Sequence, residues 1–486
     1  MPLQILPHQQ ETVTRLLASG SLLCALPAGA GKTIATLKAL ASIFSIQTLP
    51  RGVYALTQRA LILAPAPLLG VWRTELARYG EELGLPPALR LIEWRGSPAQ
   101  RAKLAQELAT LPAHTPAVVV CSYETYRQDV ATLSPLAWDL VALDESGKIR
   151  NPTAKLTKAV LKLAEKSAYR LCLDGNPVSN SIADLFAPCS FLQPGVLGAS
   201  WWKFRASYAI MSPYIQGKID GWRNVDEIKS RIQHLLYWRK KEDILPDLPE
   251  KVETVIPVAL SPAERKRYKQ IEEEFMVDIK DEQVLIENAL VKLMRLRQAT
   301  FGSTCFVEDP LAEPFGSKEE ALIALLESIG KGKKAVIFSQ FETIIRALEQ
   351  RLKTSVPWLS VHTITGSTRD REAVLSAFAE ERPDKLTILL GTSAIERGLN
   401  LQMASYMIHL DLPWSFASYD QRIGRIWRQG QKERSIIYTL EAEKTVDVRI
   451  RKLLEKKIAI AEDVSGGVSS LGLSRKELVE LFEEPF

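Results

Sequence analysis

The segment Leu26-Pro27-Ala28-Gly29-Ala30-Gly31-Lys32-Thr33 follows a short apolar run and opens a stretch long enough for a helix. Small residues let backbone N–H groups surround phosphates, a lysine neutralises phosphate charge, and a hydroxyl can hold a metal ion. The pattern therefore predicts a phosphate-binding loop that uses Gly29, Gly31, Lys32 and Thr33. Leu26 occupies the position of the pattern's first glycine, so a glycine-rich helix cap is the alternative interpretation.

Short apolar runs alternate with amphipathic stretches on both sides of this loop. Strand candidates in the first half are Leu22–Leu26, Ala60–Ala64, Ala117–Cys121, Leu140–Leu143 and Tyr169–Leu173. The same rhythm returns later at Ala335–Phe338, Ser360–Ile364, Thr387–Leu390 and Tyr406–Leu410. Apolar runs of this length are typical of strands buried on both faces of a parallel sheet. The sequence thus predicts an α/β protein with two doubly wound parallel-sheet lobes.

The middle of the chain loses the alternation and carries helix-like stretches and clustered aromatics. Leu245-Pro246-Asp247-Leu248-Pro249 is predicted to be a linker, because two prolines in five residues disfavour a helix. We expect the first lobe to span residues 1–248, with a helical insertion at about 186–245. We expect the second lobe to span 249–464, with a helical protrusion at about 260–318, and a tail at 465–486.

Composition narrows the class of protein only modestly. The chain has 486 residues and a net charge of +5, which is too small to identify a nucleic-acid-binding protein. Its five cysteines show no C-x-x-C spacing, so neither a disulfide framework nor a structural zinc site is expected. No signal peptide and no membrane-spanning run are visible. We expect a cytoplasmic, monomeric protein.

A pair of carboxylates ends the strand candidate at Leu140–Leu143. Asp144 and Glu145 follow it directly. At a magnesium–nucleotide site, one such carboxylate holds the metal and the next can orient and deprotonate the attacking water. A strand that simply ends in a turn is the alternative interpretation.

Arginines recur every third residue in the segment Gln421–Gln431. Arg422, Arg425 and Arg428 are predicted to share one face of a helix. Guanidinium groups on that face could stabilise the transition-state charge of phosphoryl transfer. A solvated basic helix is the alternative.

Together and in this order, these segments resemble a superfamily-two helicase motor. Neighbouring residues narrow the resemblance to the Swi/Snf-like branch, whose members are ATP-driven DNA translocases. The matching segments cover the chain from about Leu6 to Ala461, and include Leu6–Gln9, Leu63–Trp72, Ser122–Thr125, Asp144–Pro152, Leu173–Asn180, Trp238–Lys241, Val336–Phe341 and Gly391–Leu401. The segment Phe191–Gly198 also resembles compact bacterial and phage-type members, which favours a prokaryotic or viral source.

The resemblance implies two RecA-like lobes that bind ATP and Mg²⁺ between them and double-stranded DNA across both. Lys32 and Thr33 would then bind phosphate and Mg²⁺, Asp144 would associate with the metal, and Glu145 would be the hydrolytic base. Arg425 and Arg428 match the family's finger arginines, and Gln9 and Gln421 match residues on the nucleotide side.

The same resemblance suggests DNA contacts, mostly to the phosphate backbone. The candidates are Pro65, Ser122, Tyr123, Ser339, Gln340, Thr392, Asn400 and Trp414. For Trp414, a core aromatic is the alternative. The aromatic cluster within 201–238 could stack on single strands, but the core of the insertion is the favoured interpretation. Double-stranded DNA is the expected partner, with branched or single-stranded DNA as alternatives.

Three positions depart from the family pattern. Ser146-Gly147 replace an Ala-His pair, Asp174 replaces a threonine, and Glu396-Arg397 replace small residues. The core catalytic residues are intact, so we expect ATP hydrolysis to be retained. We expect its coupling to motor action on DNA to differ from the family's usual coupling. The predicted function is an ATP-dependent double-stranded DNA translocase. A strand-separating or annealing helicase on branched DNA and a weakly hydrolysing DNA-binding adaptor are the alternatives.

Overall fold

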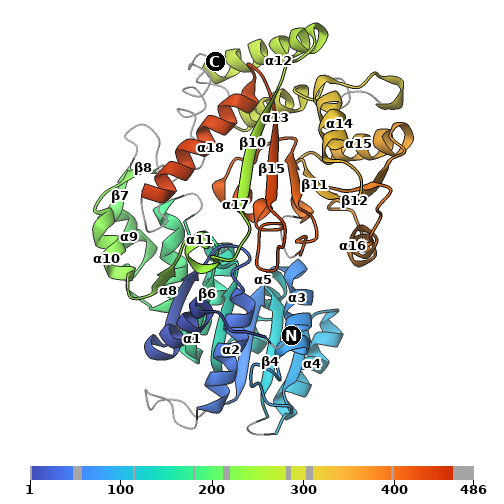
Figure 1. Cartoon of the computed structure of the whole chain (residues 1–486). Helices are drawn as coiled ribbons and strands as arrows, with labels where there is room; N and C mark the ends of the chain where they lie inside the picture. The colour runs from blue at the N-terminus through green and yellow to red at the C-terminus, as the bar shows by residue number, and fades with distance from the viewer. Residues whose placement is uncertain are drawn as a thin grey trace. The chain divides into compact units, whose positions relative to one another are not determined.

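The computed structural model describes residues 3–46, 57–112, 115–178, 181–211, 219–280, 286–302, 310–395 and 399–463. The chain divides into two compact units, one with Met1–Pro246 and the other with Asp247–Ile460. We call these units lobe 1 and lobe 2. Each is built on its own parallel sheet (Figure 1).

Lobe 1 contains a seven-stranded sheet in the order β3-β4-β2-β5-β6-β1-β9, and every pairing within it is parallel. Its strands are β1 (Ser21–Ala25), β2 (Arg59–Ala64), β3 (Arg90–Trp94), β4 (Ala117–Ser122), β5 (Trp138–Asp144), β6 (Ser167–Leu173) and β9 (Leu236–Trp238). Strands β1 and β4 are buried along their whole length, as their unbroken apolar sequences predict.

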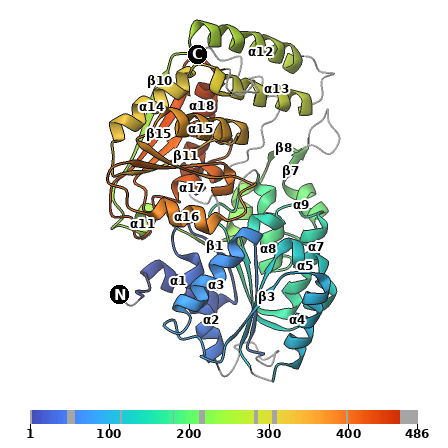
Figure 2. The same cartoon turned by 90° about the vertical axis from the view of Figure 1, so that its right-hand side faces the viewer.

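Helices cover both faces of this sheet. They are α1 (Pro7–Ser19), α2 (Lys32–Ser45), α3 (Leu69–Tyr79), α4 (Pro98–Thr110), α5 (Tyr123–Gln128), α6 (Val130–Leu133), α7 (Lys155–Leu161) and α8 (Phe186–Leu192). Figure 2 shows α1, α2 and α3 on one side of the sheet and α5, α7 and α8 on the other. This two-sided cover is the doubly wound arrangement that the alternating sequence predicts.

The stretch predicted as a helical insertion contains three further helices and also strand structure. The helices are α9 (Trp201–Tyr208), α10 (Val225–Ile232) and α11 (Lys241–Ile244), and β7 (Ala209–Met211) pairs with β8 (Ile219–Trp222). Strand β9 joins the main sheet beside β1, a role that three residues could not signal in the sequence. Around Phe204, aromatic rings of this stretch lie 5.2–5.7 Å apart between centroids and form part of the core of lobe 1. This agrees with the core interpretation.

Lobe 2 contains a six-stranded parallel sheet in the order β10-β15-β14-β11-β13-β12. Its strands are β10 (Lys251–Val258), β11 (Lys334–Phe338), β12 (Leu359–Ile364), β13 (Leu386–Gly391), β14 (Tyr406–His409) and β15 (Ser435–Ala442). The sequence patterns predicted neither β10 nor β15. β10 contains Pro257, and proline is atypical of strands. It is tolerated there because β10 is an edge strand.

Helices also cover both faces of the lobe 2 sheet. They are α12 (Pro262–Lys280), α13 (Ile286–Ala299), α14 (Ser317–Ile329), α15 (Glu342–Ser355), α16 (Arg371–Ala379), α17 (Phe416–Ile423) and α18 (Val446–Asp463). Ala335 and Ile337 of β11 share a core with α14 and α15, whereas Val336 and Phe338 share one with α13, α17 and α18. Successive side chains of a strand point to opposite faces, so both faces are buried. The predicted fold class is confirmed.

Because the strands of each sheet are parallel, their carboxyl ends meet at one edge, where open α/β sheets bind ligands. Most of the predicted site residues follow these strand ends. Within the described ranges, no helix combines the length and apolar character needed to cross a bilayer.

Candidate active site

The predicted phosphate loop connects β1 to α2. Gly29 and Gly31 have φ angles of 82° and 73°, a left-handed conformation that glycine adopts without strain. The Lys32 ammonium folds back over the loop and donates to the carbonyl oxygens of Leu26 (2.6 Å) and Pro27 (3.2 Å). Thr33 is half-buried in the first turn of α2. These residues frame a helix N-terminus with a cation beside it, which suits an anionic ligand.

The first turn of α1 packs against this loop. The buried Gln9 amide donates to the carbonyl oxygen of Ala30 (3.3 Å), and His8 Nε2 lies 2.8 Å from the same oxygen. Gln9 Oε1 also accepts from the backbone N–H of Leu6 (3.0 Å). Gln9, predicted on the nucleotide side, therefore lies beside the phosphate loop.

Asp144 and Glu145 lie at the carboxyl end of β5. Asp144 Oδ2 accepts from Trp72 Nε1 (2.9 Å), and the Tyr123 hydroxyl donates to the backbone carbonyl of Asp144 (2.9 Å). Burial, followed by the nearby charge of Glu145, raises the pKa of Asp144 to about 7. Glu145 has a φ angle of 53°, an uncommon conformation for a residue other than glycine. Such strain is typical of functional sites.

Asp174, at the end of β6, adds a third carboxylate. Its Oδ2 accepts from the backbone N–H of Gly147 (2.7 Å), and its Oδ1 accepts from that of Asn176 (2.9 Å). Burial, followed by the charge of Glu145, raises the pKa of Asp174 to about 6. A Cβ atom placed on the neighbouring Gly175 would lie 3.8 Å from Lys32 Nζ. Because β5, β6 and β1 are adjacent in the sheet, they bring all three segments together.

This geometry fits Mg²⁺ and a nucleotide triphosphate. Among the described residues, no group of three or more histidine, cysteine, aspartate or glutamate side chains could hold a metal ion by itself. Mg²⁺ characteristically uses one or two carboxylates together with substrate phosphates. Asp144 and Thr33 could supply the protein ligands. Burial, followed by the charge of Glu145, disfavours the ionised forms of Asp144 and Asp174, and a bound cation would favour them.

The residues of lobe 1 predicted to contact DNA are buried. Pro65 precedes the short turn into α3, and the Ser122 hydroxyl caps α5 by accepting from the backbone N–H of Thr125 (3.0 Å). Tyr123 is fully buried and is engaged with Asp144, so a direct DNA contact by its side chain does not fit this arrangement. Instead, Trp72 of the segment Leu63–Trp72 reaches the Asp144 carboxylate, and Tyr123 of the segment Ser122–Thr125 reaches the Asp144 backbone. The sequence pattern did not reveal this role of Trp72.

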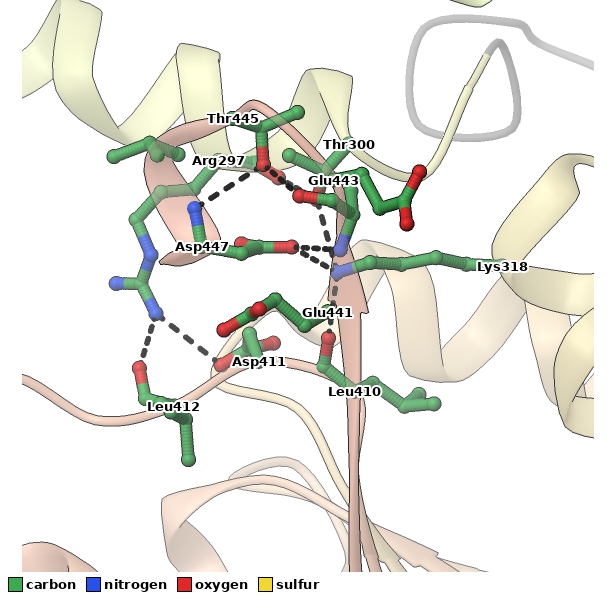
Figure 3. Close-up of polar contacts among 12 residues, drawn as sticks. Arg297, Thr300, Lys318, Leu410, Asp411, Leu412, Glu441, Glu443, Thr445 and Asp447 are labelled. Atoms are coloured by element: carbon green, nitrogen blue, oxygen red, sulfur yellow. Dashed lines mark hydrogen bonds and ion pairs between the residues drawn. The ribbon is translucent and has the colours of Figure 1, made fainter. Parts of the chain in front are cut away.

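In lobe 2, Asp411 organises the residues predicted to contact DNA. Its carboxylate accepts from the Ser339 hydroxyl and from the backbone N–H of Gln340 (3.1 Å). Arg297 Nη2 lies 3.4 Å from Asp411 Oδ1 and donates to the Leu412 carbonyl (2.6 Å), as Figure 3 shows. Ser339 is fully buried, whereas Gln340 is only partly buried and is the better placed of the two for an external ligand.

A second buried ion pair lies nearby in the same lobe (Figure 3). Lys318 Nζ is 2.5 Å from Asp447 Oδ2 and also donates to the hydroxyl of Thr300 (3.2 Å) and the carbonyl of Leu410 (3.0 Å). We call Arg297, Lys318, Asp411 and Asp447 the ion-pair network. It ties α13, α14 and α18 to the loop after β14.

The other lobe 2 candidates differ in exposure. Thr392 is buried, Asn400 is exposed, and Trp414 is half-buried with the Arg297 guanidinium 4.6 Å from its ring centroid. Trp414 also packs against the core of lobe 2, which agrees in part with its interpretation as a core aromatic.

The arginine segment differs from the prediction of one continuous helical face. Helix α17 ends at Ile423, with Gly424 as its C-cap, so Arg425 and Arg428 lie in the turns that follow. Arg422 is buried and donates to the carbonyl of Asp411 (3.0 Å). Arg425 donates to the carbonyls of Gln421 (3.1 Å) and Leu399 (3.2 Å). The guanidinium groups of Arg422 and Arg425 therefore have distinct environments.

Two of the three departures from the family pattern contact each other. The Gly147 N–H and, at 3.4 Å, the Ser146 hydroxyl both donate to Asp174. The Asp174 carboxylate thus connects the segment after Asp144 and Glu145 to the end of β6. Glu396 and Arg397, like Ser179 and Asn180, lie outside the described residues.

Comparisons with known proteins identify the family of the chain. Residues 10–302 match the model of the SNF2-related domain, and residues 317–430 match that of the helicase conserved C-terminal domain. An uncharacterized ATP-dependent helicase of Mycoplasma pneumoniae is 25% identical over 87% of this chain. The ISWI chromatin-remodeling complex ATPase CHR17 of Arabidopsis thaliana is 26% identical over 89%. The chain spans 39% of the length of each of these relatives.

A solved structure, the SWI2/SNF2 ATPase core of Sulfolobus solfataricus in complex with dsDNA, is 24% identical, with a TM-score of 0.44. The alignment covers 100% of this chain and 98% of that one. The family identification depends on the matched domain models, because the SNF2-related match takes in more than half of the chain and includes the phosphate loop and all three carboxylates. The chain belongs to the SNF2-related family, as its sequence motifs predicted.

Proposed function

We propose that the protein is a DNA-dependent ATPase that uses ATP hydrolysis to translocate along double-stranded DNA. The observation that carries this proposal is the convergence of the phosphate loop, the Asp144–Glu145 pair and Asp174 at the carboxyl ends of adjacent strands. Phosphoryl transfer requires a cradle for phosphates, a carboxylate for the metal and a base for water, and this edge of the sheet supplies all three.

In this proposal each residue has a separate task. Lys32 gives up its hydrogen bonds to the loop carbonyls and donates instead to phosphate oxygens. The N–H groups at the start of α2 bind the same phosphates. Asp144 and Thr33 would hold Mg²⁺, which when bound would neutralise charge on the phosphates. Glu145 accepts the proton of the attacking water. Arg425 and Arg428 stabilise the developing charge, and Gln9 and Gln421 bind on the nucleotide side.

DNA is the proposed partner because the chain belongs to the SNF2-related family and because the two segments predicted to contact DNA both bond to Asp144, one at its carboxylate and one at its backbone carbonyl. Trp72 and Tyr123 join these segments to Asp144. A change in either segment on DNA binding would therefore act on the metal-associated carboxylate. Gln340, Asn400 and Trp414 are the proposed lobe 2 contacts with side-chain surface left for DNA. Cytoplasmic location and a monomeric state stay predictions.

The test is an ATPase assay with duplex DNA, single strands, forked DNA and RNA, combined with displacement of a triplex strand. A translocase is expected to be stimulated most by duplex DNA and to displace the third strand. Fork unwinding without triplex displacement would instead support the helicase alternative. DNA binding with background ATP turnover would support the adaptor.

Lys32→Ala tests the assignment of the nucleotide site, and Lys38→Ala is its matched control. Lys38 lies on the same helix and donates to the carbonyl of Leu83 (3.2 Å), away from the phosphate loop. We expect Lys32→Ala to abolish DNA-stimulated turnover and Lys38→Ala to preserve it. Unchanged turnover in Lys32→Ala would refute the assignment.

A further inference from the structure

The turn that carries Glu145 needs support from its surroundings. Glu145 has a φ angle of 53°, which side chains other than glycine adopt only when neighbouring contacts enforce it. Glu145 is also the proposed base, so a small change in this backbone would displace the carboxylate from the attacking water. Contacts on either side of the residue therefore decide how well the base is placed.

The structure holds this turn on both sides of Glu145. Before it, the buried Tyr123 hydroxyl donates to the carbonyl of Asp144 (2.9 Å). After it, the N–H of Gly147 donates to Asp174 Oδ2 (2.7 Å), while Arg150 Nε donates to the Gly147 carbonyl (2.8 Å). Asp174 belongs to a different strand end, so it anchors the turn to β6.

The absence of a side chain at Gly147 leaves room for the Asp174 carboxylate. A Cβ atom on Gly147 would lie 3.1 Å from Asp174 Oδ2 and 2.7 Å from Arg150 Nη2, so a side chain there would displace the anchor. Each carboxylate oxygen of Asp174 accepts a backbone N–H, one from Gly147 and one from Asn176. An asparagine could satisfy only one of these donors and would turn its own NH₂ group towards the other.

We propose that Asp174 is a positioning residue for ATP hydrolysis, whose carboxylate holds Gly147 and thereby keeps Glu145 aimed at the attacking water. This inference depends on the proposed function, since it concerns the same reaction. Asp174 does not bind the nucleotide in this proposal. Its loss should therefore lower kcat and leave the KM for ATP nearly unchanged.

The experiment compares Asp174→Asn with Asp139→Asn in the full-length chain. Asp139 is the matched control, because it is buried in the same lobe and accepts the backbone N–H groups of Thr57 (3.0 Å) and Arg59 (3.3 Å) at the opposite end of β5. We expect Asp174→Asn to lower kcat by roughly 10- to 100-fold with less than about a threefold change in KM. Asp139→Asn should lower the melting temperature but not kcat. Equal losses of kcat in the two variants would overturn the proposal.

A second measurement isolates the route through Glu145. In single-turnover assays, Asp174→Asn should cost nothing further in a Glu145→Gln background, because the base that it positions is already absent. An equal loss in both backgrounds would show that Asp174 acts independently and would overturn the proposal. If the wild-type chain hydrolyses ATP and Asp174→Asn matches its kcat, this inference fails while the proposed function stands. If the wild-type chain hydrolyses no ATP, the proposed function itself fails.

Discussion

Lobe 1 and lobe 2 both bury charge near the carboxyl edge of a parallel sheet, but they balance it in opposite ways. In lobe 1, carboxylates gather, and burial, followed by the charge of Glu145, raises the pKa values of Asp144 and Asp174 to about 7 and about 6. In lobe 2, opposite charges pair, as in Lys318–Asp447 and Arg297–Asp411. Ionising the gathered carboxylates of lobe 1 costs free energy unless a cation binds beside them. The charges of lobe 2 are instead compensated by partners within the fold.

This difference separates a binding site from a scaffold. Like-charged groups at a strand edge indicate a missing ligand, and their perturbed pKa values mark a functional site. Paired charges in a core indicate that several elements are held in one arrangement, here α13, α14, α18 and the loop after β14. Variants at the carboxylates gathered at the lobe 1 sheet edge should therefore change turnover, and variants in the ion-pair network should change stability.

The largest expected effect is on turnover in lobe 1. Glu145→Gln removes the proposed base but keeps the shape of the side chain. We expect ATP turnover to fall by about 10²- to 10⁴-fold, with ATP binding retained. Steady-state ATPase rates and nucleotide titrations measure the two quantities. Wild-type turnover in this variant would show that another group activates the water.

A stability effect of comparable size is expected in lobe 2. Lys318→Met leaves Asp447 buried without its ion-pair partner and should lower the free energy of unfolding by about 3–5 kcal/mol. Urea unfolding of the full chain measures this change. Lys353→Met is the control, because Lys353 is exposed and its pair with the half-buried Glu349 should contribute less than about 1 kcal/mol. Similar losses in both variants would contradict the contrast between buried and exposed pairs.

A smaller effect is expected from pH. Asp144 has a pKa of about 7 in the folded chain against 3.8 in the unfolded chain, so the folded state binds more protons. Its contribution to stability is therefore present at low pH and is lost as pH rises from about 4 to 7. Mg²⁺ must displace the proton, so its affinity should rise up to about tenfold per pH unit below pH 7 and level off above. Calorimetric titration with Mg²⁺ and ATP at several pH values tests this. A flat profile would argue against Asp144 as the ligand.

The smallest effect concerns Trp72. Trp72→Phe removes the donor to Asp144, and since that bond lowers the pKa of the carboxyl, the pKa should rise further. We expect turnover at neutral pH to fall by about threefold to tenfold and to recover as the pH is raised. Trp94→Phe is the matched control, because Trp94 donates to Asp129 (2.7 Å) elsewhere in lobe 1. Equal losses in both variants would indicate a general packing effect.

Much of the fold follows from local sequence patterns. Unbroken apolar runs, as in Ala117–Cys121, predict buried parallel strands because both faces must exclude water. The same patterns could not reveal β9 or β10. Three residues are too few to show a strand periodicity, and Pro257 in β10 is a residue that usually ends a strand. They also extended a helix through Arg425 and Arg428, which in fact follow the C-cap of α17.

The phosphate loop and the Asp144–Glu145 pair could be recognised from sequence alone, because each is a contiguous motif whose chemistry depends on residue types at short spacing. The roles of Trp72, Tyr123 and Asp174 could not, because each acts on a residue 21 to 72 positions away. Sheet order brings those distant residues to one edge, and burial then shifts the pKa values of the carboxylates gathered there. Local spacing thus identified the phosphate loop and the carboxylate pair. Tertiary packing decided the pKa values of the carboxylates, the strained backbone of Glu145 and the hydrogen bonds that connect these segments.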